Sequence, residues 1–207
     1  MGRPFVIRPT QPADVQAIVD LQPLCFPPPF PSGLLWQHEH IENHLRTFPD
    51  GQFVAESDDR VVASSTSMIV SLDAWSRHGM HNVFDGYTME QHDPEGQVLF
   101  GVDISVHPDW RSRGVGRALY MARFDLVRHL GLQGYGTVCR LPDFAAWHSD
   151  RPDHDAGTYA KRVNDGCLVD RTLTPLLRYG LTFVGVIFEY MEDSESGNAA
   201  AILEWKP

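Results

Sequence analysis

The stretch "HPDWRSRGVGRALYMARFDLVRHLG", from His107 to Gly131, joins a proline-marked turn to a segment with helical periodicity. Arginine and glycine gather where that helix would begin, although the whole chain carries a net charge of −10. Farther along, apolar residues recur at steps of three and four, namely Val115, Leu119, Ala122, Leu126 and Leu130. We therefore predict a helix from Val115 to Leu130 that packs on a sheet and begins in an arginine-rich loop.

This loop has the chemistry of an anion site. The first turn of a helix leaves backbone N–H groups without partners, and the helix dipole makes that end partly positive. Glycine lets an anion approach the backbone, and arginine side chains offer forked donors to phosphate oxygens. The residues expected to contact the anion are Arg111, Ser112, Arg113, Gly114, Val115, Gly116 and Arg117.

Two common nucleotide-binding motifs do not fit this spacing. A Walker loop requires GxxxxGK[ST], and neither the lysine nor the hydroxyl residue is present. A Rossmann fingerprint requires a third glycine at the position where Leu119 stands. It also requires an acidic residue near position 134, and none is present there. The sequence therefore excludes both of these nucleotide sites.

The segment "ISVHPDWRSRGVGRAL" resembles the acyl-CoA pyrophosphate loop of the GNAT N-acetyltransferase superfamily, with Arg111, Gly114 and Gly116 at the defining positions. Likeness extends over nearly the whole chain, through "FVIRPTQPADVQAIVDL", "FVAESDDRVVASS" and "LLRYGLTFVG". The loop from Ser71 to Gln97 and the stretch "GTVCRLPDF" are similar to a subgroup often fused to a carbon–nitrogen hydrolase domain. No such domain is expected here.

The predicted elements alternate as β-α-α-β-β-β-α-β-α-α-β-β, which mixes hairpins with crossovers and indicates a mixed α/β (α+β) fold. The proline cluster "PLCFPPPFP" from Pro23 is expected to be a rigid connector outside any helix. Resemblance to the GNAT superfamily implies a twisted mixed sheet, splayed at its centre, with flanking helices. A single acyl-CoA N-acyltransferase domain would then cover residues 1–207.

The resemblance also implies direct transfer of an acetyl group from acetyl-CoA to a primary amine in a ternary complex. Backbone N–H groups at the end of the strand before the loop would polarise the thioester carbonyl, in the region of Ser105, Val106 and His107. These three residues join the loop in the predicted cofactor site. The acceptor would enter over the loop after Ser71 and the segment 142–160.

Asp103 is the candidate general base, because it interrupts an apolar strand where many relatives carry an acidic group that acts through water. His107 is a second candidate. The family often places its proton donor on the helix before the last hairpin, but that position is Leu176 here. Tyr179, one helical turn later, or Tyr159 would have to substitute. If neither does, the thiolate must leave unaided or take a proton from water, and catalysis would be slower or absent. The rival reading is a non-catalytic module that binds and senses acyl-CoA, and use of a different acyl-CoA is a third.

Composition narrows the partners. The 17 basic and 27 acidic residues argue against binding to nucleic acid and against a basic membrane anchor. They favour a cationic acceptor, either a small molecule or a peptidyl amine. No apolar run approaches the length of about 20 residues that a membrane-spanning helix needs. Three scattered cysteines favour a reduced, cytoplasmic protein. "HIENH" lacks the HExxH spacing, so no metal is expected, and a homodimer is left open.

Overall fold

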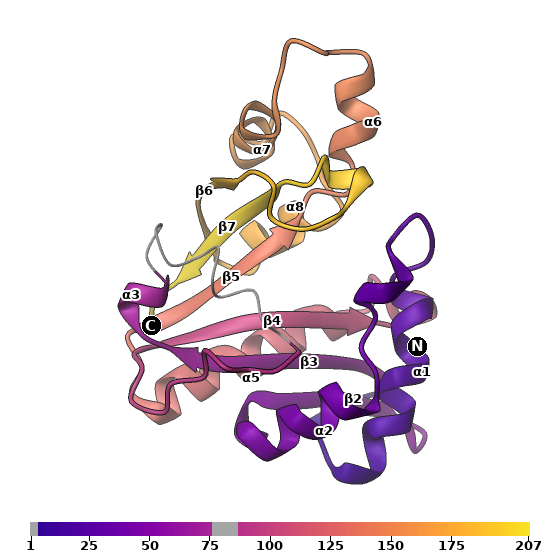
Figure 1. Ribbon diagram of the computed structural model, residues 1–207, viewed down its shortest axis with the longest axis vertical. Helices are drawn as coiled ribbons and strands as arrows, with labels where there is room; N and C mark the ends of the chain where they lie inside the picture. The colour runs from indigo at the N-terminus through magenta and orange to yellow at the C-terminus, as the bar shows by residue number, and fades with distance from the viewer. Residues whose placement is uncertain (1–3, 76–86) are drawn as a thin grey trace. The chain divides into compact units, whose positions relative to one another are not determined.

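The computed structural model describes residues 4–75 and 87–207 of the chain (Figure 1). It divides into two compact units. The first unit comprises residues 1–27 and 32–135 together with Pro207, and the second comprises residues 28–31 and 136–206.

Four antiparallel strands form the sheet of the first unit. Neighbours in the sheet follow the chain order, β1 (Val6–Pro9), β2 (Gln52–Ser57), β3 (Arg60–Val70) and β4 (Val98–Val106). The turn between β2 and β3 places Asp58 and Asp59 at φ values of 50° and 58°, a left-handed conformation that aspartate tolerates. β2 and β3 therefore form an antiparallel hairpin.

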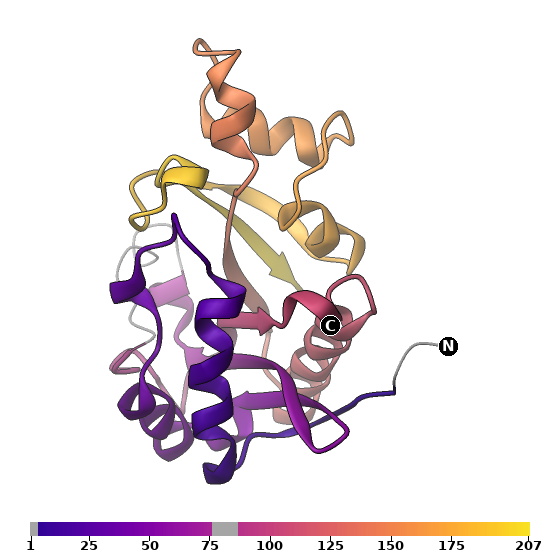
Figure 2. The same ribbon diagram turned by 90° about the vertical axis from the view of Figure 1, so that its right-hand side faces the viewer.

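Helices cover both faces of that sheet. Figure 2 shows α1 (Val15–Cys25) and α2 (His38–Thr47) on one side of the strands and α5 (Val115–Leu130) on the other. α5 has the predicted bounds, and Gly131 ends it in a left-handed conformation at φ 67°. A short helix, α3 (Leu72–Trp75), follows β3. Single 3₁₀ turns lie at Pro12–Asp14, Ser32–Leu34, Pro49–Gly51 and Pro108–Trp110.

One prediction about the proline cluster was wrong. α1 continues through Pro23 to Cys25, so the first residues of the supposed connector are helical. In the interior of a helix, proline removes the hydrogen bond of its own N–H and tends to break the helix. Here it lies in the last turn, where the N–H of Phe26 still bonds to the carbonyl of Gln22 at 2.9 Å. The helix therefore reaches two residues beyond the proline.

The second unit contains three strands and three helices in its described residues. The strands are β5 (Gly134–Arg140), β6 (Thr182–Ile187) and β7 (Ala200–Trp205), in the order β5-β7-β6, and the helices are α6 (Phe144–Ser149), α7 (Ala156–Asn164) and α8 (Leu173–Arg178). A 3₁₀ turn lies at Ser194–Ser196. β6 and β7 pair antiparallel. β5 begins in the first unit and continues in the second.

The mixed α/β class predicted from the sequence is confirmed. α2 begins at His38, after Gln37, whose backbone is extended. The buried face of α5 differs from the predicted apolar stripe. Leu130, which belongs to the stripe, is exposed, whereas Tyr120 and Phe124, which lie outside it, are buried. No described helix is both long enough and apolar enough to cross a membrane.

Candidate functional site

The loop from residue 111 to residue 117, the 111–117 loop, is pinned at both ends by buried side chains. Trp110 precedes it and Val115 opens α5, and both pack in one apolar cluster with Leu119. Ala55, Val62 and Ala63 of the sheet complete that cluster. The loop backbone is therefore held rigidly, while most of its side chains remain exposed to solvent.

The backbone of this loop leaves a row of N–H groups unbonded. Ser112 and Gly114 adopt left-handed conformations at φ values of 59° and 86°, and backbones of this kind form concave anion sites. From Ser112 to Arg117 the backbone N–H groups bond to nothing in the described chain; the next donor, the N–H of Ala118, bonds to the carbonyl of Gly114 at 2.9 Å. The space beside the Cα of Gly114 is open. These features fit a diphosphate group at the start of α5.

The three arginines of the loop play different parts. Arg111 bonds through its Nε to the carbonyl of Val106 at 3.2 Å and through a terminal nitrogen to the carbonyl of Cys25 at 3.1 Å. It therefore ties the loop to the end of β4 and to the last turn of α1. Arg113 lies over the ring of Trp110 at 5.3 Å. Arg117 forms no hydrogen bond or ion pair with the described residues, so it is the arginine best able to meet a new anion.

The end of β4 presents one backbone N–H group away from β3. The N–H of His107 bonds to the carbonyl of Val62 at 2.9 Å, and Val106 pairs opposite Ala63. Because bonding alternates along an antiparallel pair, the N–H of Ser105 also faces β3, whereas the N–H of Val106 points to the other edge. Of the three residues predicted to polarise a carbonyl, Val106 alone has an N–H directed away from β3.

Asp103 lies in β4, and a chain of hydrogen bonds reaches it from α1. Ser105 Oγ donates to a carboxylate oxygen of Asp103 at 3.0 Å and accepts from Nε2 of Gln22 at 3.1 Å. Burial raises the pKa of Asp103 to about 6, while the bond from Ser105 and the charge of Arg123 lower it. A carboxyl group with this pKa is mostly ionised at pH 7 and can accept a proton.

We expect Ser105→Ala to raise the pKa of Asp103 from about 6 to about 7. The serine hydroxyl bonds to the ionised carboxylate, so its loss disfavours the charged form and moves the titration to higher pH. Carboxyl ¹³C NMR of aspartate-labelled protein measures this directly, with Asp103→Asn to assign the signal. Ser149→Ala, at an exposed serine of α6, serves as the control. A titration unchanged by Ser105→Ala would show that this hydrogen bond does not act on Asp103.

The remaining candidates have defined surroundings. His107 accepts the N–H of Asp109 at Nδ1 over 3.2 Å, which fits a cap on the turn after β4. In the second unit, Tyr159 is 1% exposed and donates its hydroxyl to Asp170 at 3.0 Å, so it is already committed to a buried carboxylate. Tyr179 ends α8 and is half-buried. Asp103 belongs to the first unit and Tyr179 to the second, so their pairing stays a prediction.

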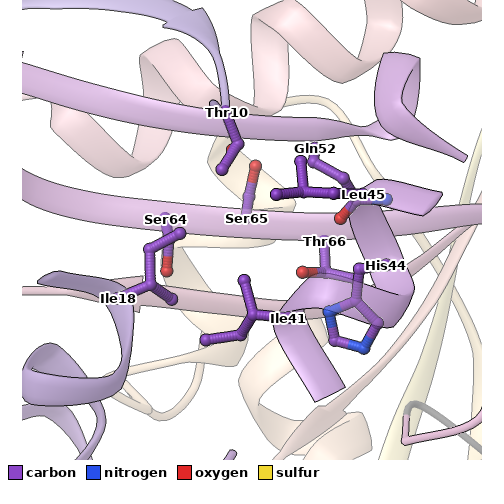
Figure 3. A pocket seen from close by; sticks show the side chains of 9 residues that line it. All are labelled: Thr10, Ile18, Ile41, His44, Leu45, Gln52, Ser64, Ser65 and Thr66. Atoms are coloured by element: carbon purple, nitrogen blue, oxygen red, sulfur yellow. The ribbon is translucent and has the colours of Figure 1, made fainter. Parts of the chain in front are cut away.

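Two other hollows, both lined by described residues of the first unit, do not suit a coenzyme. Figure 3 shows a cavity between α1, α2 and the sheet with a volume of about 10 Å³, room for about one water molecule. Two nearly buried polar atoms that line it, Ser65 Oγ and Gln52 Oε1, have no hydrogen-bond partner in the described chain. A shallower groove is lined by Arg8, which is already paired with Asp14 and Glu56. Within residues 4–75 and 87–207 no cluster of three metal-binding side chains occurs.

Sequence reasoning missed three residues around Asp103. Gln22 and Cys25 come from α1, and Arg123 comes from the buried face of α5. Burial raises the pKa of the Cys25 thiol to about 12, with a further contribution from the charge of Asp103, so this thiol stays neutral. The loop after Ser71, where the acceptor was expected to enter, includes residues 76–86, which lie outside the described residues.

Comparison with known proteins identifies the family of the chain. The model of the acetyltransferase (GNAT) family matches residues 15–149. An uncharacterised N-acetyltransferase of Bacillus subtilis, YkwB, is 34% identical over 209 residues, covering 99% of this chain and 91% of that protein. A probable hydrolase of the same organism, YhcX, is 32% identical over 203 residues; the match covers 97% of this chain but 38% of the longer relative.

Solved structures share the fold at low identity. The loading GNATL domain of CurA from Lyngbya majuscula superposes with a TM-score of 0.82 at 18% identity and covers 98% of both chains. The GphF GNAT-like decarboxylase, solved with isobutyryl-CoA, gives 0.77 at 20% identity over 97% of this chain and 98% of that one. The yncA protein of Salmonella typhimurium, solved with acetyl-CoA, gives 0.59 at 14% identity, covering 98% and 93%.

Proposed function

Because the chain belongs to the GNAT family of acetyltransferases, we propose that it transfers an acetyl group from acetyl-CoA to the primary amine of an acceptor. Transfer would be direct, with both substrates bound together. Acetyl-CoA supplies the acetyl group as an activated thioester. The residues of the chain bind that thioester, orient it and remove a proton from the amine.

One observation carries this proposal: the unbonded N–H groups from Ser112 to Arg117 at the start of α5. A row of directed donors suits the diphosphate of CoA, and the positive end of the helix adds to the attraction. Arg117 and the remaining donors of Arg111 and Arg113 would neutralise its charge. Since the loop is anchored by Trp110 and Val115, little ordering is needed when the anion binds.

At the end of β4, the N–H of Val106 is the proposed donor to the thioester oxygen. Asp103 is the proposed general base, which would remove a proton from the amine through a water molecule. Its carboxyl must be ionised to act, so turnover at subsaturating amine should fall as the pH drops through about 6. Acceptor amines must also be neutral, which favours higher pH for most of them.

Tyr179 is the proposed acid that returns a proton to the departing thiolate. Its place at the end of α8, three residues after the family's tyrosine position, supports the proposal. The acceptor is proposed to be a small-molecule or peptidyl amine, and the acidic composition favours one that carries further positive charge. A single functional domain over residues 1–207 is part of the same proposal.

A second candidate is a module that binds acyl-CoA without catalysis. It is favoured by Leu176, which stands at the tyrosine position and is 4% exposed in the interior of the second unit. No proton donor can come from that side chain. A related variant, transfer of a larger acyl group, is suggested by the isobutyryl-CoA bound to GphF.

Incubating the protein with acetyl-CoA and a panel of amines, while following free thiol, separates these functions. We expect thiol release that depends on at least one amine, because Asp103 has a pKa suited to deprotonation at pH 7 to 8. Polyamines, aminoglycosides and lysine peptides form the panel, with isobutyryl-CoA as the alternative acyl donor. Tight CoA binding without thiol release for any amine or donor would contradict the enzyme and support the binding module.

A further inference from the structure

β4 is irregular where Asp103 lies. Asp103 pairs with Thr66 of β3, but the next pair along the strands joins Gly101 with Ser67, so Val102 is an extra residue in a β-bulge. Bulges interrupt the ladder and leave backbone groups without strand partners. In this case the carbonyls of Thr66 and Asp103 lie beside the interruption, where a donor from outside the two strands can bond to them.

Arg123 supplies those bonds from α5. One terminal nitrogen of its guanidinium donates to the carbonyl of Thr66 at 2.8 Å and also to the carbonyl of Asp103, while the other donates to the hydroxyl of Tyr135 at 3.0 Å. The residue is 1% exposed, and its charge lies near the rings of Tyr120 and Tyr135, at 5.4 and 5.8 Å. Within the described chain no carboxylate forms an ion pair with it.

Burying a guanidinium without a paired carboxylate costs free energy, so the arrangement needs another reason. The Tyr135 hydroxyl, which bonds to this guanidinium, packs directly against Gly101. A Cβ at position 101 would collide with that hydroxyl. Lysine could not copy the arrangement, because a single ammonium lacks the planar fork that spans two carbonyls and a phenol. The guanidinium is thus matched to the bulge and to its tyrosine.

We propose that Arg123 is a positioning residue for acetyl transfer, one that fixes the bulge of β4 and thereby sets the place and charge of the Asp103 carboxyl. This inference rests on the proposed role of Asp103 as base. Arg123 bonds to the main chain of Asp103 from the α5 side, while Ser105 and Gln22 bond toward its carboxylate from the α1 side. Two sets of hydrogen bonds therefore hold one residue from both faces of the sheet.

Among the described residues of the first unit, few ionisable groups act on this carboxyl. Arg123 faces it from α5, and its positive charge favours the ionised form. Cys25 faces it from α1, but with a pKa of about 12 the thiol is neutral throughout the working range. Arg111 lies beyond, next to Cys25. Removing the charge at position 123 should therefore raise the pKa of Asp103.

The test compares Arg123→Lys and Arg123→Met with Arg128→Met, a control at an exposed arginine on the same helix. Each variant is measured by aspartate ¹³C NMR titration, by kcat with the best amine from the panel, and by KM for acetyl-CoA. In Arg123→Met we expect the pKa of Asp103 to rise to about 7 or above, because an opposing charge is lost. In Arg123→Lys the pKa should stay near about 6 because the charge remains.

Both Arg123 variants should lower kcat about 10-fold or more while KM for acetyl-CoA changes less than about 3-fold, since the base is misplaced and the CoA loop is untouched. Tyr135→Phe, which removes one partner of the guanidinium, tests the same arrangement more gently and should give a smaller loss of kcat. If Arg123→Met fails to fold, the lysine and Tyr135→Phe variants decide the matter.

Unchanged kcat in Arg123→Lys and Tyr135→Phe, together with an unchanged pKa in any folded Arg123→Met protein, would overturn the inference. Failure of the proposed function would look different. In that case Asp103→Asn would keep full turnover, or no amine would react, while the NMR titration would still report whether Arg123 governs Asp103.

Discussion

Asp103→Asn is expected to reduce kcat for acetyl transfer by about 100-fold or more while leaving the affinity for CoA within about 2-fold of the original. Asparagine keeps the size of the side chain and can still bond to Ser105, but it cannot accept the proton of the amine. The 111–117 loop, which is the proposed CoA site, lies beyond the end of β4 and does not involve this side chain. Steady-state kinetics and calorimetric titration with CoA measure the two quantities.

A pH profile makes this prediction sharper. In the unmodified protein, kcat/KM for the amine should fall below an apparent pKa of about 6, and that acidic limb should be absent from the residual activity of Asp103→Asn. Asp125→Asn, at an exposed carboxylate of α5, controls for the loss of one negative charge. If Asp103→Asn turned over as fast as the control, another group would have to be the base, and His107 would be the next to replace.

The conformation of the 111–117 loop could be predicted from sequence because its determinants are local. Gly114 permits a left-handed backbone at the point where the chain enters α5, and Val115 begins the apolar stripe that fixes the helix on the sheet. Both requirements are expressed within a few residues of one another. The spacing of arginine and glycine therefore specified the loop before any tertiary contact was known.

The surroundings of Asp103 could not be predicted in the same way. Gln22 donates a hydrogen bond to the hydroxyl of Ser105, 83 positions away in the sequence, and no local sequence pattern predicts that contact. Nor does the sequence of β4 reveal its bulge, because an extra residue is defined only by the register with β3. The pKa of Asp103 depends on both features, so the sequence could suggest a base but not its strength.

Arg123 is an intermediate case, since a signal was present and was not used. It stands four residues after Leu119 and three before Leu126, so helical periodicity places it on the buried face of α5. A charge at such a position demands polar partners in the interior. Sequence alone could have identified the demand, but only the fold shows that bulge carbonyls and a tyrosine meet it.

Conversely, the local rule that proline lies outside helices gave a wrong prediction for the start of the proline cluster. Proline opposes a helix interior, but its effect is limited to its own missing N–H and to crowding of the preceding turn. At Pro23 the helix has two more residues to run, and the carbonyl of Cys25 in that last turn accepts a bond from Arg111. The end of α1 is thereby tied to the 111–117 loop, which links this helix to the proposed cofactor site.

Gly114→Val is expected to weaken CoA binding about 100-fold or more, a loss of about 2.7 kcal/mol in binding free energy. Two effects combine at this position. Its φ of 86° is strained for any residue with a Cβ, and for a β-branched one above all, so the backbone will tend to leave the conformation that directs the N–H groups outward. The added side chain would also occupy the open space from which the anion approaches.

Gly131→Val separates loss of the anion site from loss of stability. Gly131 lies at the other end of the same helix, has a φ of 67° and likewise faces open space, so the backbone strain is comparable while the CoA loop is untouched. Both variants should lose about 1–2 kcal/mol or more of unfolding free energy, but only Gly114→Val should lose CoA affinity. Calorimetry with CoA and with pantetheine, which lacks the diphosphate, completes the comparison: the loss should be confined to CoA. Equal CoA affinity in the two variants would mean that the diphosphate binds elsewhere, because nothing else at Gly114 distinguishes it from its counterpart at the far end of α5.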